Sequence, residues 1–259
     1  MSARVAVLRG RTSDRTGDGV RGAEALGAAV AERLGVPATV IGEPGAPREA
    51  QWRDDLRDAA PVLADAAQAI GAALDAGEEP ALFASDCTIA VATLPALVRR
   101  EPDVRIVWLD AHGDFNTPGT SASGYLGGMC LAGACGRWDA GFGGGVDPAR
   151  VVLSDARDLD AAEREELERA GLAPISPAAV AAAVRGERVF LHLDLDVLDP
   201  SEMACTFPAP GGLSMDQLRA LLAQLADAAD IVGIEVTSMA APAPAPRVAE
   251  LLLPLLLRR

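Results

Sequence analysis

Short apolar runs alternate along the whole chain with longer stretches in which apolar residues recur at helical spacing. The apolar runs predict buried β-strands at residues 5–8, 38–41, 81–84, 106–109, 151–153, 189–195 and 231–236. The stretches between them predict helices at 20–34, 49–76, 88–99, 159–170, 214–228 and 247–257. This alternation predicts an α/β fold with a mostly parallel central sheet, helices on both of its faces, and a single domain over residues 1–259.

Two aspartate-rich segments stand out, and each directly follows an apolar run. The first reads Asp110-Ala-His112-Gly-Asp114-Phe-Asn116, and the second reads Asp194-Leu-Asp196-Val-Leu-Asp199-Pro200. Because the carboxyl ends of parallel strands meet at one edge of a sheet, we expect these carboxylates and the imidazole to gather there. Burying several carboxylates together is costly unless cations lie among them. The pattern therefore predicts a metal site, for two ions.

Two long stretches without regular spacing, 116–128 and 199–212, follow the two aspartate segments. Loops of this length in a compact domain are often functional. The glycine-rich stretch 141–145 has neither the GxGxxG order nor a following helix, so it predicts a turn.

Composition narrows the partners to small molecules. The chain has 23 Lys and Arg against 37 Asp and Glu, a net charge of −14, which disfavours nucleic acid and anionic membranes as partners. The N-terminus resembles a first strand rather than a signal peptide, and the apolar run 251–257 is too short to span a bilayer. The four cysteines form no CxxC pair, which favours a reducing cytoplasm.

The two aspartate segments, together with the later Glu235, resemble the signature blocks of the arginase/agmatinase (ureohydrolase) family in order and spacing. The resemblance implies a three-layer α/β/α sandwich that holds two Mn²⁺ ions. It implies that Asp110 and Asp194 bridge both ions. Asp114 then completes one ion, and His112 with Asp196 completes the other. Carboxylate oxygens with one imidazole suit Mn²⁺.

One further ligand position departs from the family. The family has Gly-Gly-Asp-His-Ser after its third strand, where this chain has Ala84-Ser85-Asp86-Cys87-Thr88. Without the resemblance, a lone cysteine after a strand is an ordinary core residue. With it, we expect Cys87 to bind metal as a thiolate. A thiolate softens the site, so Zn²⁺, Fe²⁺ or Co²⁺ can compete with Mn²⁺.

This chain has suitable residues at the positions that bind substrate in the family. By the resemblance, Asn116, Ser121 and Ser123 hold the α-carboxylate of an amino acid, and Asp160 and Glu163 receive its α-ammonium group. In isolation, the last two are equally an ordinary acidic first turn of a helix. Agmatine has no carboxylate, so this set favours an amino-acid substrate.

The expected catalytic groups are Asp114, which carries the proton of the attacking water, and Glu235, which orients the guanidine group. The histidine that donates a proton in the family's arginases is replaced by Gly127, and a pocket threonine is replaced by Pro208. A substrate that needs less acid catalysis reconciles these changes. Nω-hydroxy-L-arginine has a weakly basic guanidine and gives hydroxyurea and L-ornithine. The changes are similar to the branch of the family that performs this step in D-cycloserine biosynthesis.

Alternatives remain open at this point. The nearest is another ureohydrolase, either an arginase or a guanidino-acid hydrolase. A zinc deacetylase of the related histone deacetylase fold is disfavoured because the tandem histidines of that class are missing. A metal-binding pseudoenzyme fits the loss of the two histidines. The sequence does not decide whether the protein is a monomer or a homo-oligomer.

Overall fold

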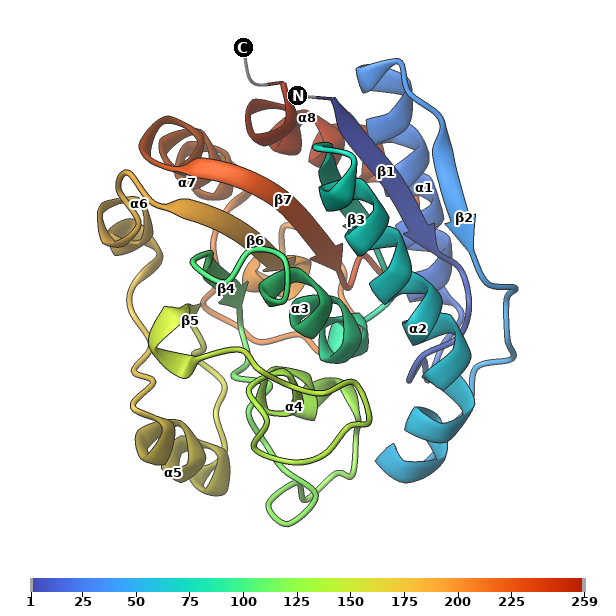
Figure 1. The fold of residues 1–259 in the computed structure, drawn as a ribbon, viewed down its shortest axis with the longest axis vertical. Coiled ribbons are helices and arrows are strands. Elements are labelled where there is room, and N and C mark those ends of the chain that lie inside the picture. Colours follow the sequence, from blue (N-terminus) through green and yellow to red (C-terminus); the bar gives the residue numbers. More distant parts are fainter. Residues whose placement is uncertain (1, 258–259) are drawn as a thin grey trace.

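The strands form one continuous parallel sheet (Figure 1). The computed structural model describes residues 2–257. The strands in this range are β1 (Ala3–Leu8), β2 (Ala38–Ile41), β3 (Glu79–Phe83), β4 (Arg105–Asp110), β5 (Val151–Asp155), β6 (Arg188–Asp194) and β7 (Asp230–Thr237). Their order across the sheet is β2-β1-β3-β7-β6-β4-β5, and each neighbouring pair runs parallel. Each predicted strand is therefore present.

Helices cover both faces of this sheet. They are α1 (Asp18–Leu34), α2 (Trp52–Asp75), α3 (Ala90–Val98), α4 (Cys130–Ala134), α5 (Ala161–Ala170), α6 (Val180–Ala183), α7 (Met215–Ala228) and α8 (Ala245–Leu256). Helices α1, α6, α7 and α8 pack into one hydrophobic core, and α2 to α5 pack into the other (Figure 1). The predicted three-layer α/β/α sandwich is confirmed. The short helices α4 and α6 were not predicted.

Alternation along each strand supplies side chains to both cores. In β4, Val107 and Leu109 face the α1, α7 and α8 layer, whereas Ile106 and Trp108 face the α2 and α3 layer. Successive strand side chains point to opposite faces, so a strand that is buried on both sides must be apolar throughout. This requirement explains the continuous apolar runs in the sequence.

A capping box starts α7 where the sequence predicts a helix. The Ser214 hydroxyl accepts a hydrogen bond from the Gln217 backbone N–H at 3.1 Å, and the Gln217 side chain accepts one from the Ser214 N–H at 2.8 Å. These two bonds satisfy donors that the first helical turn leaves unpaired.

Arg157 fixes the second long loop beside the sheet edge. Its guanidinium donates to the backbone oxygens of Asp196 at 2.9 Å and Ala209 at 2.6 Å. It thereby joins the segment after β6 to the loop 199–212. The loop is held against the carboxyl edge of the sheet, which is where the candidate site lies.

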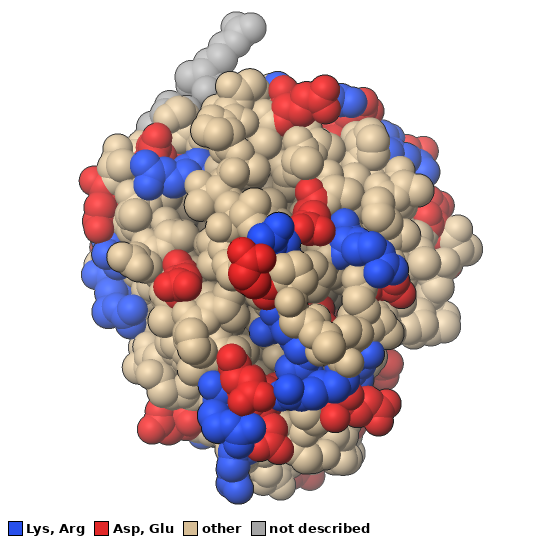
Figure 2. Space-filling model, turned by 90° about the vertical axis from the view of Figure 1, so that its right-hand side faces the viewer, with Lys and Arg blue, Asp and Glu red and all other residues tan. Residues whose placement is uncertain are grey.

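On the molecular face seen in Figure 2, basic and acidic side chains are interspersed. Within residues 2–257, no helix is both long enough and apolar enough to cross a membrane.

Candidate metal centre

The six predicted metal ligands line one small cavity at the carboxyl edge of the sheet. They are Cys87, Asp110, His112, Asp114, Asp194 and Asp196. They come from the chain that leaves β3, β4 and β6. Segments that are more than a hundred residues apart in the sequence therefore meet, as the parallel sheet predicts.

The donor atoms form two overlapping groups. Asp110, His112 and Asp196 make one, and Cys87, Asp110 and His192 make the other, with the donor atoms of each group within 4.8 Å of one another. Asp110 belongs to both groups. This arrangement suits two neighbouring cations that share a carboxylate.

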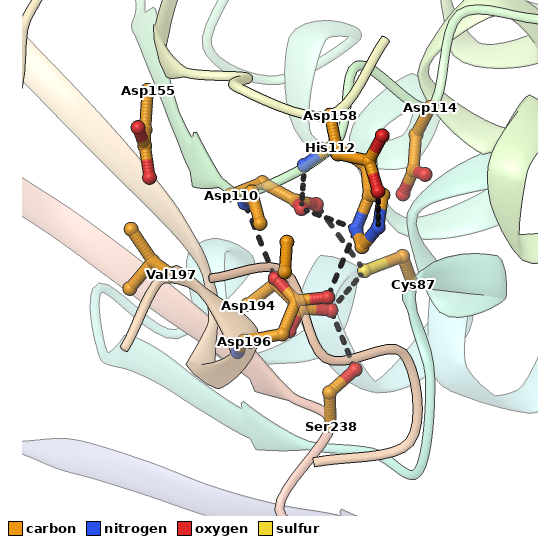
Figure 3. A network of polar contacts seen from close by, with 12 residues as sticks. Cys87, Asp110, His112, Asp114, Asp155, Asp158, Asp194, Asp196, Val197 and Ser238 are labelled. Atoms are coloured by element: carbon orange, nitrogen blue, oxygen red, sulfur yellow. Dashed lines mark hydrogen bonds and ion pairs between the residues drawn. The ribbon is translucent and has the colours of Figure 1, made fainter. Parts of the chain in front are cut away.

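Figure 3 shows how closely these side chains face one another. His112 Nδ1 lies 3.0 Å from Asp196 Oδ2 and 3.4 Å from Asp110 Oδ1. Cys87 Sγ lies 2.8 Å from Asp194 Oδ2 and 3.7 Å from Asp110 Oδ2. The thiol and the imidazole therefore both lie close to Asp110.

Local turns aim the carboxylates into the cavity. One oxygen of Asp110 accepts the His112 backbone N–H at 2.7 Å, and one oxygen of Asp194 accepts the Asp196 N–H at 2.8 Å. Such side-chain-to-backbone bonds two residues on are typical of aspartate at the end of a strand. The second oxygen of Asp110 accepts the Trp108 indole N–H at 3.1 Å, and that of Asp194 accepts the Thr237 hydroxyl at 3.1 Å. Asp114 has a φ of 48°, a left-handed conformation that costs free energy and is concentrated at functional sites.

The cluster is short of positive charge. Burial raises the pKa of Asp114, and the neighbouring Asp110 raises it further. Burial and the charge of Asp194 likewise raise the pKa of Asp196. Burial alone lowers the pKa of His112, but its contacts with Asp110 and Asp196 outweigh that effect and raise it to about 12. Acidic groups that hold protons so firmly indicate a site built for cations.

Cys87 contacts the buried His192, which in turn contacts the buried Glu235. His192 Nε2 lies 3.3 Å from Cys87 Sγ, and His192 Nδ1 lies 2.8 Å from Glu235 Oε1. Thr93 donates to the other oxygen of Glu235 at 2.6 Å. The Trp108 ring stacks on His192 with centroids 3.6 Å apart. This set fixes the imidazole against the thiol.

Glu235 is fully buried in this arrangement and does not line either cavity described here. Both of its carboxylate oxygens are engaged by His192 and Thr93. The role in orienting the guanidine group therefore stays a prediction. In the structure, Glu235 contacts His192 and Thr93.

A larger pocket opens outward from the ligand cluster. It has a volume of about 290 Å³ and is lined by Arg15, His112, Asp114, Asn116, Ser123, Tyr125, Gly128, Asp158, Asp160, Glu163 and Phe207. Of the predicted substrate-binding residues, it contains Asn116, Ser123, Asp160 and Glu163 but neither Ser121 nor Glu235. The Ser121 hydroxyl instead accepts the Gly124 N–H at 3.1 Å. A pocket of this size suits a single small-molecule ligand.

The acidic end of this pocket is internally organised. Asp160 caps α5 by accepting the Glu163 N–H at 2.8 Å, and its other oxygen accepts Asn116 Nδ2 at 3.2 Å. Glu163 accepts the Phe115 N–H at 2.8 Å. Burial raises the pKa of Glu163 to about 7, with the charge of Asp160 adding to the effect. Asn116 Oδ1 is buried and has no hydrogen-bond partner among residues 2–257.

Sequence reasoning missed Arg15, Tyr125, Asp158 and Phe207, which also line the pocket. The Arg15 guanidinium lies 4.9 Å from the Tyr125 ring centroid, and the Phe207 ring lies 4.8 Å from it on centroids. Tyr125 is the only tyrosine in the chain and lies two residues before Gly127. Its position close to Gly127 was the one sequence feature that could have pointed to Tyr125 as a pocket residue. Arg15 lies in no motif.

Comparisons with known proteins agree with this geometry. A family model described as "Arginase family" matches residues 38–251. The chain is 36% identical over 246 residues to an N(omega)-hydroxy-L-arginine amidinohydrolase from Streptomyces lavendulae, covering 93% of this chain and 90% of that protein. It is 32% identical over 199 residues to an arginase from Brevibacillus brevis, covering 69% and 66%. Among solved structures, an arginase from Bacillus caldovelox superposes with a TM-score of 0.84 at 25% identity, covering 100% of this chain and 99% of that one.

Proposed function

This chain belongs to the arginase family and is a hydrolase of guanidino carbon–nitrogen bonds, and we propose that it cleaves Nω-hydroxy-L-arginine to hydroxyurea and L-ornithine. The observation that carries the proposal is Cys87 at the ligand cluster, with glycine rather than histidine at position 127. The likeness to a hydroxyarginine amidinohydrolase over 93% of the chain supports it.

The residues present fit a pair of Mn²⁺ ions. We propose that Asp110 and Asp194 would be shared by the two ions, that Asp114 and Cys87 would help to hold one, and that His112 and Asp196 would help to hold the other. The small cavity that the six ligands line, here called the inner cavity, has more carboxylates than cationic groups, which supports this assignment. When bound, the ions would lower the pKa of a water molecule in the cavity and so supply a nucleophile at neutral pH.

The larger pocket of about 290 Å³, here called the outer pocket, has a lining that supports an amino-acid substrate. Arg15 is the one basic side chain of Lys or Arg type that lines it within the described chain, and Asp160 and Glu163 lie among the acidic residues. A substrate with both an α-carboxylate and an α-ammonium group matches this pairing. Asn116 and Ser123 add neutral polar groups that can bond to the carboxylate. A decarboxylated substrate would offer Arg15 no carboxylate to bind.

Two residues carry the proposed chemistry from the protein side. Asp114, which lines both cavities, takes a proton from the water that attacks the guanidine carbon. Glu235 fixes the His192 imidazole, which in turn holds the Cys87 side chain toward the carboxylates. A buried carboxyl group with two hydrogen-bond partners is a stable anchor for such a chain of contacts. The release of hydroxyurea would place the protein in D-cycloserine biosynthesis.

Steady-state kinetics of the Mn²⁺-loaded protein test this proposal. L-Arginine and Nω-hydroxy-L-arginine are compared side by side by the release of ornithine. We expect kcat/KM for the hydroxylated substrate to be higher by about two orders of magnitude or more, the scale of a lost general acid. Equal or better turnover of arginine would identify an arginase instead. Metal binding without turnover of either compound would identify a pseudoenzyme.

A further inference from the structure

The space in front of Gly127 is filled by the Tyr125 ring. A Cβ atom added to Gly127 would lie 2.5 Å from Tyr125 Cε1, 2.9 Å from Cζ and 3.0 Å from the phenol oxygen. Contacts this short do not occur between real atoms without a shift of one partner. A side chain at position 127 and a tyrosine ring at 125 therefore exclude each other. The phenol occupies the volume that a larger residue at 127 would take.

Tyr125 lies where the two cavities meet. It lines the inner cavity with the metal ligands and also the outer pocket with the substrate-binding residues. Arg15 lies over the ring at 4.9 Å, and Phe207 packs against it at an interplanar angle of 51°. A cation over one aromatic face and a neighbouring ring restrain a side chain with only two rotatable bonds. The Tyr125 side chain is thus restrained at a position that borders both the metal ligands and the substrate-binding residues.

The hydroxyl of Tyr125 is a neutral proton donor in an otherwise acidic cavity. Burial raises the pKa of Tyr125 and the charge of Asp86 raises it further, so that the phenol keeps its proton. The Ser13 hydroxyl opposes this shift by bonding to the phenol oxygen. Among residues 2–257, the other hydroxyl lining the inner cavity belongs to Ser238, and it donates to Asp194. Tyr125 therefore differs from Ser238, because within the described part of the chain its hydroxyl donates no hydrogen bond to a predicted metal ligand.

We propose that Tyr125 is a catalytic residue that protonates the departing δ-nitrogen of the substrate. This inference rests on the proposed hydrolysis of a guanidino amino acid. Cleavage of the carbon–nitrogen bond leaves its electron pair on the δ-nitrogen, and the phenol proton forms the new N–H bond. The proton that Asp114 took from the attacking water then restores the phenol. The second water proton ends on the urea product, so no further acid, base or oxidant is consumed.

The test compares the wild-type protein with Tyr125→Phe, both as the full chain loaded with Mn²⁺. The variant keeps the ring, and with it the contacts to Arg15, Phe207 and Gly127, and loses only the hydroxyl. For Nω-hydroxy-L-arginine we expect kcat to fall about 100-fold or more, with KM within about threefold. Metal content and thermal midpoint should match the wild type, which separates a lost proton donor from a damaged fold.

A change of leaving group provides a second readout. L-Canavanine releases an alkoxyamine, which is far less basic than the alkylamine released from Nω-hydroxy-L-arginine and needs less help from an acid. We expect the loss in kcat to be less than about tenfold for this substrate. An equal loss for both substrates, or a loss below about threefold for Nω-hydroxy-L-arginine, overturns the role of Tyr125. Failure of the wild type on every guanidino substrate overturns the proposed function itself, which is a distinguishable result.

Discussion

The substitution Glu163→Gln should make the protein less sensitive to rising pH. Burial raises the pKa of Glu163 to about 7 from its ordinary value of 4.5. The folded chain therefore binds this proton more tightly than the unfolded chain does. The resulting stability is fully present below pH 4.5 and is lost as the pH rises through 7. A difference of roughly 2.5 pKa units corresponds to about 3 kcal/mol, of which most is lost between pH 5 and pH 8.

Urea denaturation at these two pH values measures the effect in metal-free protein without substrate. Glutamine keeps the acceptor for the Phe115 N–H but cannot ionise. We expect the wild type to lose about 2–3 kcal/mol more than the variant between pH 5 and pH 8, since the other titrating groups cancel in this comparison. Parallel pH dependence of the two proteins, within about 0.5 kcal/mol, would refute the buried-acid reasoning.

Three further substitutions probe the site. Cys87→Ala should lower the bound manganese from two ions towards one per chain, measured by elemental analysis; full occupancy would show that the thiol is not a ligand. Arg15→Ala should raise KM for the amino-acid substrate about tenfold or more through loss of a charged contact, while weak turnover of agmatine stays unchanged; a matching change for both would remove Arg15 from carboxylate binding. Gly127→Ala should cost about 1–3 kcal/mol of stability and reduce kcat, because the new methyl group displaces the Tyr125 ring; an unchanged thermal midpoint and kcat would contradict that contact.

Periodic features of the sequence were sufficient to predict most of the fold. Runs such as 106–109 are apolar because β4 is buried on both faces, so both the strand and its parallel neighbours could be inferred. Helices α4 and α6 have only five and four residues, which is too short for a 3.6-residue period to be recognised. The predicted ligands met in one cavity because each follows a strand of the same sheet.

The parts of the site that were missed depend on contacts between distant segments. His192 is paired in register with Glu235 on the neighbouring strand, and no local pattern fixes that register. Arg15 and Phe207 reach Tyr125 from separate loops, whose conformations follow from the packing of the whole chain. The metal cluster could be predicted from the types of its residues, whereas the residues of the pocket wall could be identified only from the folded structure.

Identification of the products in ¹⁸O-labelled water tests the central claim most directly. The Mn²⁺-loaded protein is incubated with Nω-hydroxy-L-arginine and the mixture is analysed by mass spectrometry. The account predicts equal amounts of L-ornithine and hydroxyurea, with the label in the hydroxyurea carbonyl and no product after metal removal. Citrulline and hydroxylamine, which arise from cleavage of the other carbon–nitrogen bond, or the absence of any product, would contradict it.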